Sequence, residues 1–308
     1  MPPTSHVIDL DGPVHYLDFS AQVSAQARPT PEGRTPMVLV HGLGGSHANW
    51  LSVASRLAEH GQVYALDLAG FGKSPKESRT AMVEDNRALL DRFLARVVGG
   101  KATLVGNSMG GLICMMEAVA RPWRVDKLVL VNPSLPKPRG VSIDKQVALV
   151  FATYMLPFIG PYLFKKRTAS LTPEQSIRET MQLCCKDPSR IEPAVLQEMI
   201  RVAAHRRTLE GGEEAFLAAA RSIVALVLRN ARFVDLVRRV QQPTLLMHGV
   251  HDRLVPIASA RAAAAMRPDW DFVVFDDGGH VPQLEHPARF VETVTSWLAE
   301  RTRAGVAA

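Results

Sequence analysis

Ser108 lies in a run of small residues that suits a nucleophilic serine. The run GNSMGG, residues 106–111, follows a short apolar stretch and precedes a helical pattern from Met109 to Ala120. A sharp turn from strand to helix exposes a serine hydroxyl, and glycines on either side prevent backbone clashes. The turn also places the serine at a helix N-terminus, which favours developing negative charge. We therefore predict that Ser108 is a nucleophile, against the alternative of a surface serine in a glycine-rich turn.

His280 and Asp252 are the residues that we expect to activate this serine. A serine hydroxyl is a poor nucleophile at neutral pH, so it needs a histidine to accept its proton and a carboxylate to hold the imidazole tautomer. Both residues follow strand-like runs, and the chain order Ser, Asp, His is the one this chemistry uses on α/β sheets. His286 and either Asp276 or Asp277 are the reserve candidates. His286 is the weaker base because the proline after it places it at a helix start.

A second glycine-rich stretch offers the donors that acyl transfer requires. His41-Gly42-Leu43-Gly44-Gly45 directly follows the apolar run 37–40. A tetrahedral intermediate is stabilised by two main-chain N–H groups, and glycines let the main chain approach the substrate. We assign the donors to Leu43 and Met109. The stretch lacks the spacing of a phosphate-binding loop.

We expect no metal and no cofactor. His248 and His251 lie near Asp252, but a spacing of three at the end of a strand does not direct both imidazoles to one ion. No cysteine or carboxylate cluster completes a ligand set there.

The candidate residues follow buried strands. Short apolar runs rich in Val and Leu are each followed by a longer helical pattern, which is typical of parallel strands covered by helices on both faces. The runs are 37–40, 63–66, 102–105, 127–131, 244–247 and 271–275. They predict an α/β fold with a mostly parallel sheet flanked by helices. Open sheets of this kind place their sites at the carboxyl ends of the strands.

Two further segments complete the predicted architecture. Residues 7–10 and 14–19 flank an Asp-Gly turn and predict an antiparallel hairpin at the sheet edge, followed by a mobile loop at 21–36. The strand pattern stops after residue 131 and resumes near residue 242. We therefore predict a core formed by 1–133 and 241–308 and an inserted helical cap formed by 134–240.

The composition is that of an ordinary globular protein. Of 308 residues, 47% are hydrophobic and 21% are charged. The net charge of +6 arises from 36 basic and 30 acidic residues without a long basic block, so we expect no nucleic-acid partner. Three cysteines, two of them adjacent, exclude a disulfide framework and favour a reducing compartment. Because residues 1–12 lack a secretory signal pattern, we expect a cytoplasmic location.

Taken in order, these motifs resemble those of the α/β-hydrolase superfamily over nearly the whole chain. They are His41-Gly42, the DLAGFGKS segment at 67–74, GNSMGG around Ser108, the segment 249–252 and Gly279-His280. The resemblance implies the α/β-hydrolase fold and a Ser-Asp-His triad. Serine at position 108 differs from the aspartate of haloalkane dehalogenases and epoxide hydrolases. The GNSMGG motif is similar to that of hydrolases acting on ring-fission products of aromatic degradation and to that of lipases.

The cap is expected to shape the substrate pocket. Residues 147–164 are uncharged, but two prolines and a glycine interrupt them, so a pocket-lining helix followed by a turn is favoured over a membrane span. Peripheral contact with lipid stays an alternative. The expected apolar wall comprises Val150, Phe151, Tyr154, Met155, Leu156 and Phe158, and further substrate contacts are assigned to His41, Gly42, Asn107 and Val281. The basic residues of the cap, Arg201, Arg206, Arg207, Arg229, Arg232, Arg238 and Arg239, are expected to be solvated, unless one binds a substrate carboxylate.

These residues predict a serine hydrolase that cleaves carboxylic esters, esterase- or lipase-like, with a small and apolar substrate. The alternative is a carbon–carbon bond hydrolase of ring-fission products. Those enzymes usually have tryptophan after the catalytic histidine, where this chain has Val281. A third possibility is a non-catalytic binding protein on the same scaffold. The oligomeric state is left open.

Overall fold

Strands β1 to β8 form one sheet in the order β1-β2-β4-β3-β5-β6-β7-β8. The computed structural model describes residues 2–20 and 35–306. The strands are β1 Thr4–Asp9, β2 Pro13–Asp18, β3 Met37–Val40, β4 Val63–Leu66, β5 Ala102–Asn107, β6 Val125–Val131, β7 Thr244–Gly249 and β8 Asp271–Phe275. Neighbours from β4 to β8 pair in parallel, whereas β1 pairs with β2 and β2 with β4 in antiparallel fashion. The predicted parallel sheet and edge hairpin are confirmed, and most of the predicted loop, 21–34, lies outside the described residues.

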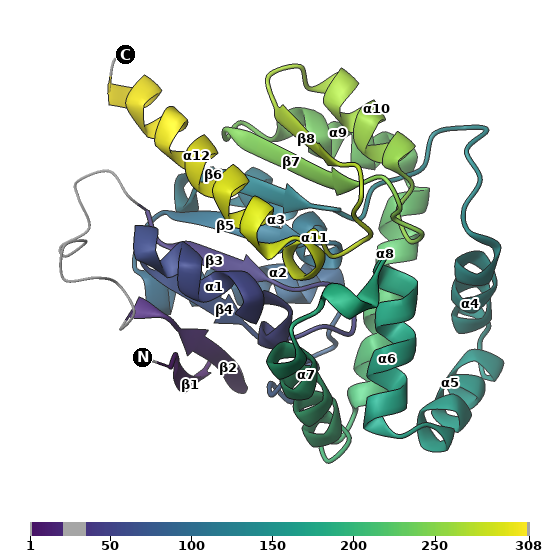
Figure 1. Ribbon diagram of the computed structural model, residues 1–308. Coiled ribbons are helices and arrows are strands. Elements are labelled where there is room, and N and C mark those ends of the chain that lie inside the picture. The colour runs from purple at the N-terminus through teal and green to yellow at the C-terminus, as the bar shows by residue number, and fades with distance from the viewer. Residues whose placement is uncertain (1, 21–34, 307–308) are drawn as a thin grey trace.

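Helices cover both faces of the sheet, which explains why β3, β4, β5 and β7 are buried along their whole length. On one face, α1 (Leu51–Leu57) and α12 (Pro287–Val306) pack around Trp50, Phe275 and Phe290. On the other face lie α2 (Val83–Phe93), α3 (Met109–Ala120) and α10 (Ile257–Met266), as Figure 1 shows. This arrangement holds the carboxyl ends of the parallel strands at one edge.

The segment between β6 and β7, all of which is described, contains helices and no strand. The helices are α4 Lys145–Met155, α5 Ile159–Ser170, α6 Pro173–Cys184, α7 Pro193–Arg206, α8 Gly212–Leu228 and α9 Asn230–Arg239. Figure 1 shows α4 and α5 as the rim furthest from the sheet. Residues of α6 and α7 share a small core with Val281 and Leu284, whereas Phe233 and Val237 of α9 join the core beneath the sheet. Within the described residues, no single helix is long and apolar enough to cross a membrane.

Candidate active site

Ser108 lies on a strained turn between β5 and α3. Its backbone has φ +55° and ψ −117°, a conformation that side-chain-bearing residues rarely adopt and that often marks functional sites. The neighbouring glycines make this turn fit: a Cβ on Gly106 would lie 2.5 Å from the Gly110 carbonyl oxygen, and one on Gly110 would lie 2.1 Å from that of Val40. The turn leaves Ser108 partly exposed at the first turn of α3.

Asp252 and His280 form a buried pair across two neighbouring strand ends. Asp252 Oδ2 lies 2.7 Å from His280 Nδ1, and both side chains are almost fully buried. Burial alone would raise the pKa of Asp252, but the charge and hydrogen bond of His280 outweigh it, so the pKa lies below its usual value. An ionised carboxylate only accepts hydrogen bonds, so His280 Nδ1 carries the proton and Nε2 is left to accept another.

Three further donors fix the Asp252 carboxylate. Its Oδ1 accepts from the backbone N–H groups of Leu254 (2.8 Å) and Val255 (2.9 Å). Its Oδ2 accepts from Asn132 Nδ2 at 2.7 Å. Asn132 follows β6, is fully buried and has a φ of +44°, which asparagine tolerates better than most residues. Asn132 was not among the predicted site residues, although its place just after a predicted strand was a usable signal.

Ser108 and His280 line the same cavity. No hydrogen bond joins their side chains among the described residues, which is common in a site without substrate. The backbone of His280 is held on both sides, because its N–H donates to the Cys184 carbonyl (2.6 Å) and its carbonyl accepts from Asn107 Nδ2 (3.1 Å). The imidazole is thus anchored on the cavity wall that also carries the serine.

Glu285 ties the histidine loop to the segment after α6. One of its carboxylate oxygens accepts from the Gly279 N–H at 2.7 Å, and the other accepts from those of Lys186 (2.8 Å) and Asp187 (3.0 Å). The loop that carries His280 is therefore bonded directly to the segment between α6 and α7. The sequence analysis did not identify Glu285.

Leu43 and Met109 are the residues to which the oxyanion donors were assigned. Leu43 lines the cavity, and Met109 is the first residue of α3, directly after the serine. Neither backbone N–H has an acceptor among the described residues. A Cβ on Gly42 would lie 3.0 Å from Cβ of Ser108, so the glycine-rich loop passes directly beside the nucleophile candidate.

His41 and Asn107 do not have the contacts predicted for them. His41 is fully buried away from the cavity, its Nδ1 donates to the Gly42 carbonyl, and its Nε2 accepts from the Leu68 N–H. Burial lowers the pKa of His41 to about 4, so it stays neutral and shapes the loop. Asn107 borders the cavity, but its amide group bonds backbone carbonyls rather than facing a substrate. Gly42 and Val281 line the cavity as predicted.

The reserve candidates lie elsewhere. His286 Nε2 contacts the Asp277 carbonyl oxygen (2.7 Å) and the Arg190 guanidinium (3.0 Å). The Asp277 carboxylate pairs with Lys186 and Arg190, and these hydrogen bonds lower its pKa to about 2. Asp276 is exposed. None of the three lines the cavity.

The cavity has a volume of about 1720 Å³, larger than the roughly 300–1,000 Å³ typical of small-molecule sites. Val150, Phe151 and Tyr154 of α4 line it, as predicted. Met155, Leu156 and Phe158 do not, contrary to the prediction. The reason is that α4 ends at Met155 and the chain bends before α5, which turns Leu156 and Phe158 into solvent.

One cavity residue carries an unbalanced positive charge. Of the predicted cap arginines, Arg206 and Arg207 line the cavity, and the other five do not. The Arg206 guanidinium lies 5.0 Å from the centre of the Phe71 ring and donates to the Gly212 carbonyl. Burial lowers the pKa of Arg206 to about 10, and no carboxylate among the described residues pairs with it. A negatively charged group of a substrate would find its counter-charge there.

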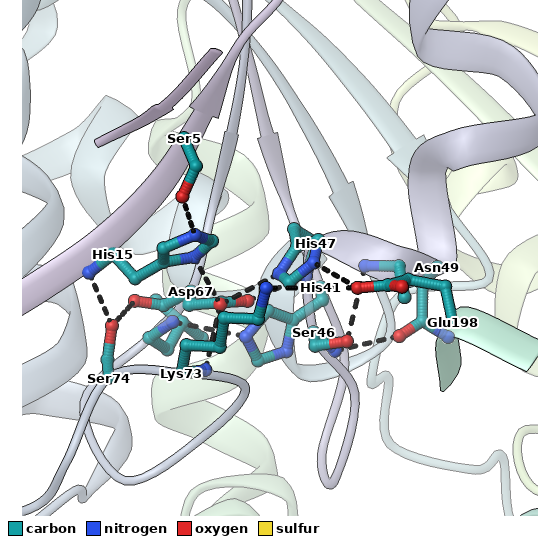
Figure 2. A network of polar contacts seen from close by, with 12 residues as sticks. Ser5, His15, His41, Ser46, His47, Asn49, Asp67, Lys73, Ser74 and Glu198 are labelled. Carbon is teal, nitrogen blue, oxygen red and sulfur yellow. Dashed lines mark hydrogen bonds and ion pairs between the residues drawn. The ribbon is translucent and has the colours of Figure 1, made fainter. Parts of the chain in front are cut away.

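A separate buried network surrounds Asp67, which follows β4 (Figure 2). Its carboxylate accepts from His15 Nδ1 (2.8 Å), His47 Nδ1 (2.8 Å), the His47 N–H (2.6 Å) and the Lys73 N–H (2.9 Å). Although the three side chains have the types and proximity of metal ligands, four donors already satisfy the carboxylate, and their positions fit a structural role. The network joins β2 and β4 to His47, which follows the glycine-rich loop 41–45.

Comparisons of sequence and structure with known proteins support this fold. The chain is 28% identical over 274 residues, 86% of this chain and 84% of the relative, to 2-hydroxy-6-oxo-6-(2'-aminophenyl)hexa-2,4-dienoic acid hydrolase of Metapseudomonas resinovorans. It is 28% identical over 269 residues, 87% of this chain, to the dihydrolipoyllysine-residue acetyltransferase component of the acetoin cleaving system of Pseudomonas putida, and it spans only 64% of that relative's length. An esterase structure from Thermogutta terrifontis superposes with a TM-score of 0.67 at 23% identity, covering 97% of this chain and 99% of that one.

The family assignment rests on a match over most of the chain. The model of the alpha/beta hydrolase fold family matches residues 35–287, a range that runs from just before β3 to the start of α12. It includes the serine turn, the Asp252–His280 pair and the inserted helices. This chain therefore belongs to the α/β-hydrolase fold family.

Proposed function

We propose that this hydrolase cleaves carboxylic esters through an acyl-enzyme, with Ser108 as nucleophile, His280 as general base and Asp252 as the group that orients it. The observation that carries the proposal is the buried Asp252–His280 bond of 2.7 Å beside a cavity that Ser108 also lines. A histidine held in this tautomer has a free Nε2 to accept the serine proton. The strained backbone of Ser108 supports the same role.

The proposed reaction has two balanced steps. Ser108 Oγ attacks the ester carbonyl carbon while its proton moves to His280 Nε2, and the N–H groups of Leu43 and Met109 stabilise the oxyanion. The carbon–oxygen bond breaks, and the alcohol leaves with the proton from His280. Water then attacks the acyl-serine and gives its proton to His280 Nε2. The bond between the acyl carbon and Ser108 Oγ breaks as His280 returns that proton to Oγ, which releases the acid and restores the serine. No step calls for a cofactor.

The cavity supports an apolar acyl or alkyl group as the substrate's larger part. Phe151 and Tyr154 provide an aromatic wall, and the volume accommodates a group of many carbons. We also propose that residues 134–240 act as the cap over this cavity.

The cysteines Cys114, Cys184 and Cys185 are free thiols, which supports a reducing, cytoplasmic setting.

The second candidate is cleavage of a carbon–carbon bond in a ring-fission acid. The relative from Metapseudomonas resinovorans is named for such a hydrolase. Arg206 favours this candidate as well, since its unpaired guanidinium suits the carboxylate of such an acid. Val281 stands where those hydrolases usually have tryptophan, which favours the ester reaction.

The test is p-nitrophenol release from acyl esters of increasing chain length, with the Ser108→Ala variant assayed in parallel. We expect turnover by the parent protein and none by the variant, with a chain-length optimum that reflects the cavity. A fluorophosphonate should label the parent at Ser108. Labelling without ester turnover, together with turnover of a coloured ring-fission acid, would replace the ester reaction by carbon–carbon cleavage. A folded protein that neither labels nor turns over would instead be a binding protein.

A further inference from the structure

Large apolar side chains are concentrated on the outer surface of α4 and α5. Among the described residues, six of the ten exposed large hydrophobic side chains lie between residues 149 and 163. They are Leu149 (70% exposed), Leu156 (46%), Phe158 (90%), Ile159 (55%), Tyr162 (65%) and Leu163 (40%), which we call the apolar rim. Scattered single hydrophobic residues are normal on a protein surface, but a contiguous group of this kind marks an interaction site.

Large apolar side chains lie on both the inner and the outer side of this helix pair. The inner face of α4 presents Phe151 and Tyr154 to the cavity, and Phe164 of α5 stacks on Phe216 of α8. A helix that covers a core normally has polar residues on its other face. Here the outward positions of α4 and α5 carry Leu149, Tyr162 and other members of the apolar rim. The outer face therefore has the composition of a surface that a binding partner or a membrane covers.

The shape of the helix pair favours lying on a membrane rather than crossing it. The axes of α4 and α5 differ by 117°, and neither helix alone could span a bilayer. The corner between them carries Leu156, Phe158 and Ile159, with Phe158 in a left-handed conformation at φ +62°. Figure 1 places this corner at the rim furthest from the sheet, so it can enter a surface without steric conflict with the core.

The charges around the apolar rim are positive. Lys145 at the start of α4 and Lys166 in α5 are exposed and form no ion pair with described residues. No acidic residue occurs between Asp144 and Glu174, and Asp144 is paired with Arg253. Apolar side chains flanked by lysines are the pattern of helices that bind the interface of an anionic bilayer, because the lysines reach phosphate groups while the apolar groups enter the acyl region.

We propose that the apolar rim docks this protein on the surface of a bilayer that contains anionic lipids. The lysines provide the attraction to the surface, and the corner residues provide the hydrophobic anchor. Docking in this orientation places the outer wall of the cavity against the bilayer, since the opposite face of α4 lines that cavity. The proposal does not depend on which bond the enzyme cleaves.

The test is co-sedimentation of the full chain with vesicles made of equal parts phosphatidylcholine and phosphatidylglycerol, compared with vesicles of phosphatidylcholine alone. We expect binding to the anionic vesicles that weakens with salt. The Phe158→Ser/Ile159→Ser variant should bind at least about tenfold more weakly, because each side chain loses its transfer into the acyl region. Lys145→Gln and Lys166→Gln should each weaken binding by about fivefold. Neither pair of residues lines the cavity.

Trp123→Ser is the matched control, because Trp123 is 60% exposed and follows α3, at the opposite end of the sheet from the serine. Its vesicle binding should equal that of the parent. Circular dichroism melting shows whether each variant is folded, and a variant of Phe158 alone replaces the double variant if that one unfolds. Sedimentation velocity identifies a second copy as the occupant. The proposal is overturned if the parent does not bind anionic vesicles, if the rim variant binds as well as the Trp123 control, or if the rim variant abolishes a dimer without changing vesicle binding.

Discussion

Replacing Asp252 by asparagine tests whether this carboxylate sets the tautomer of His280. The backbone N–H groups of Leu254 and Val255 both point at Oδ1, so the asparagine must place its carbonyl oxygen there. Its NH₂ group then occupies the Oδ2 position, 2.7 Å from both His280 Nδ1 and Asn132 Nδ2. To accept from this NH₂, His280 must carry its proton on Nε2, where it can no longer accept one from Ser108.

The expected loss follows from the contacts that change. Losing a hydrogen bond to a charged acceptor costs about 1.5–3 kcal/mol, and leaving the Asn132 amide facing another donor costs about 1–3 kcal/mol more. The sum, about 2.5–6 kcal/mol, corresponds to a fall of about 10²- to 10⁴-fold in kcat. The known cost of a wrong histidine tautomer in an unrelated serine protease lies at the upper end of this range.

The rate of fluorophosphonate labelling at Ser108 measures this effect without knowledge of the substrate, and ester turnover gives kcat where an ester is cleaved. Asp277→Asn is the control, because it removes an exposed carboxylate paired with Lys186 and Arg190, outside the cavity. We expect that variant to label at the parent rate. An Asp252→Asn protein that is folded and labels within threefold of the parent would refute the assignment of Asp252.

Three other substitutions have clear expected outcomes. Gly110→Ala should lower the free energy of unfolding, measured by urea titration, by about 3 kcal/mol or more, because the new Cβ would lie 2.1 Å from a backbone oxygen. Gly100 has open space around it, so Gly100→Ala should change the free energy of unfolding by less than about 0.5 kcal/mol. Asp67→Asn should lower the melting temperature at neutral pH. Burial opposes ionisation of Asp67, but its histidine partners hold its pKa below the usual 3.8. The stabilisation by the ionised carboxylate is therefore present above pH 3.8 and is lost as the pH falls below that value. The deficit of the variant should therefore shrink below about pH 4, and a deficit independent of pH would contradict the charged state of Asp67. Arg206→Gln should raise KM by about tenfold for an ester that has a terminal carboxylate on its acyl chain, and it should leave KM unchanged for the neutral ester of equal length. Equal effects on both esters would contradict this expectation.

The sequence predicted the strands because burial on both faces leaves a local record in their composition. It also placed Ser108, Asp252 and His280 at strand ends, since each follows such a run. The position of Asn132 after a predicted strand was a usable signal, but its pairing with Asp252, 120 residues away, left none. Glu285 escaped prediction because its partner Lys186 lies 99 residues away in the chain. No local pattern records contacts of that range.

The outward turn of Leu156 and Phe158 was missed for a different reason. An apolar composition predicts burial, and the sequence does not say whether protein or another medium covers the side chain. The bend of 117° before α5 decides the direction of these residues, and both helices pack against Phe216 of α8. Composition therefore identified the apolar segment but placed Leu156 and Phe158 in the cavity wall, where the structure exposes them.

The bonds of Glu285 constrain how the cavity can open. Because its carboxylate joins the loop of His280 to residues 186 and 187, the chain after α6 cannot lift away without displacing that loop. The histidine N–H bond to Cys184 adds to this restraint. The part of the insertion near α6 thus behaves as a fixed wall.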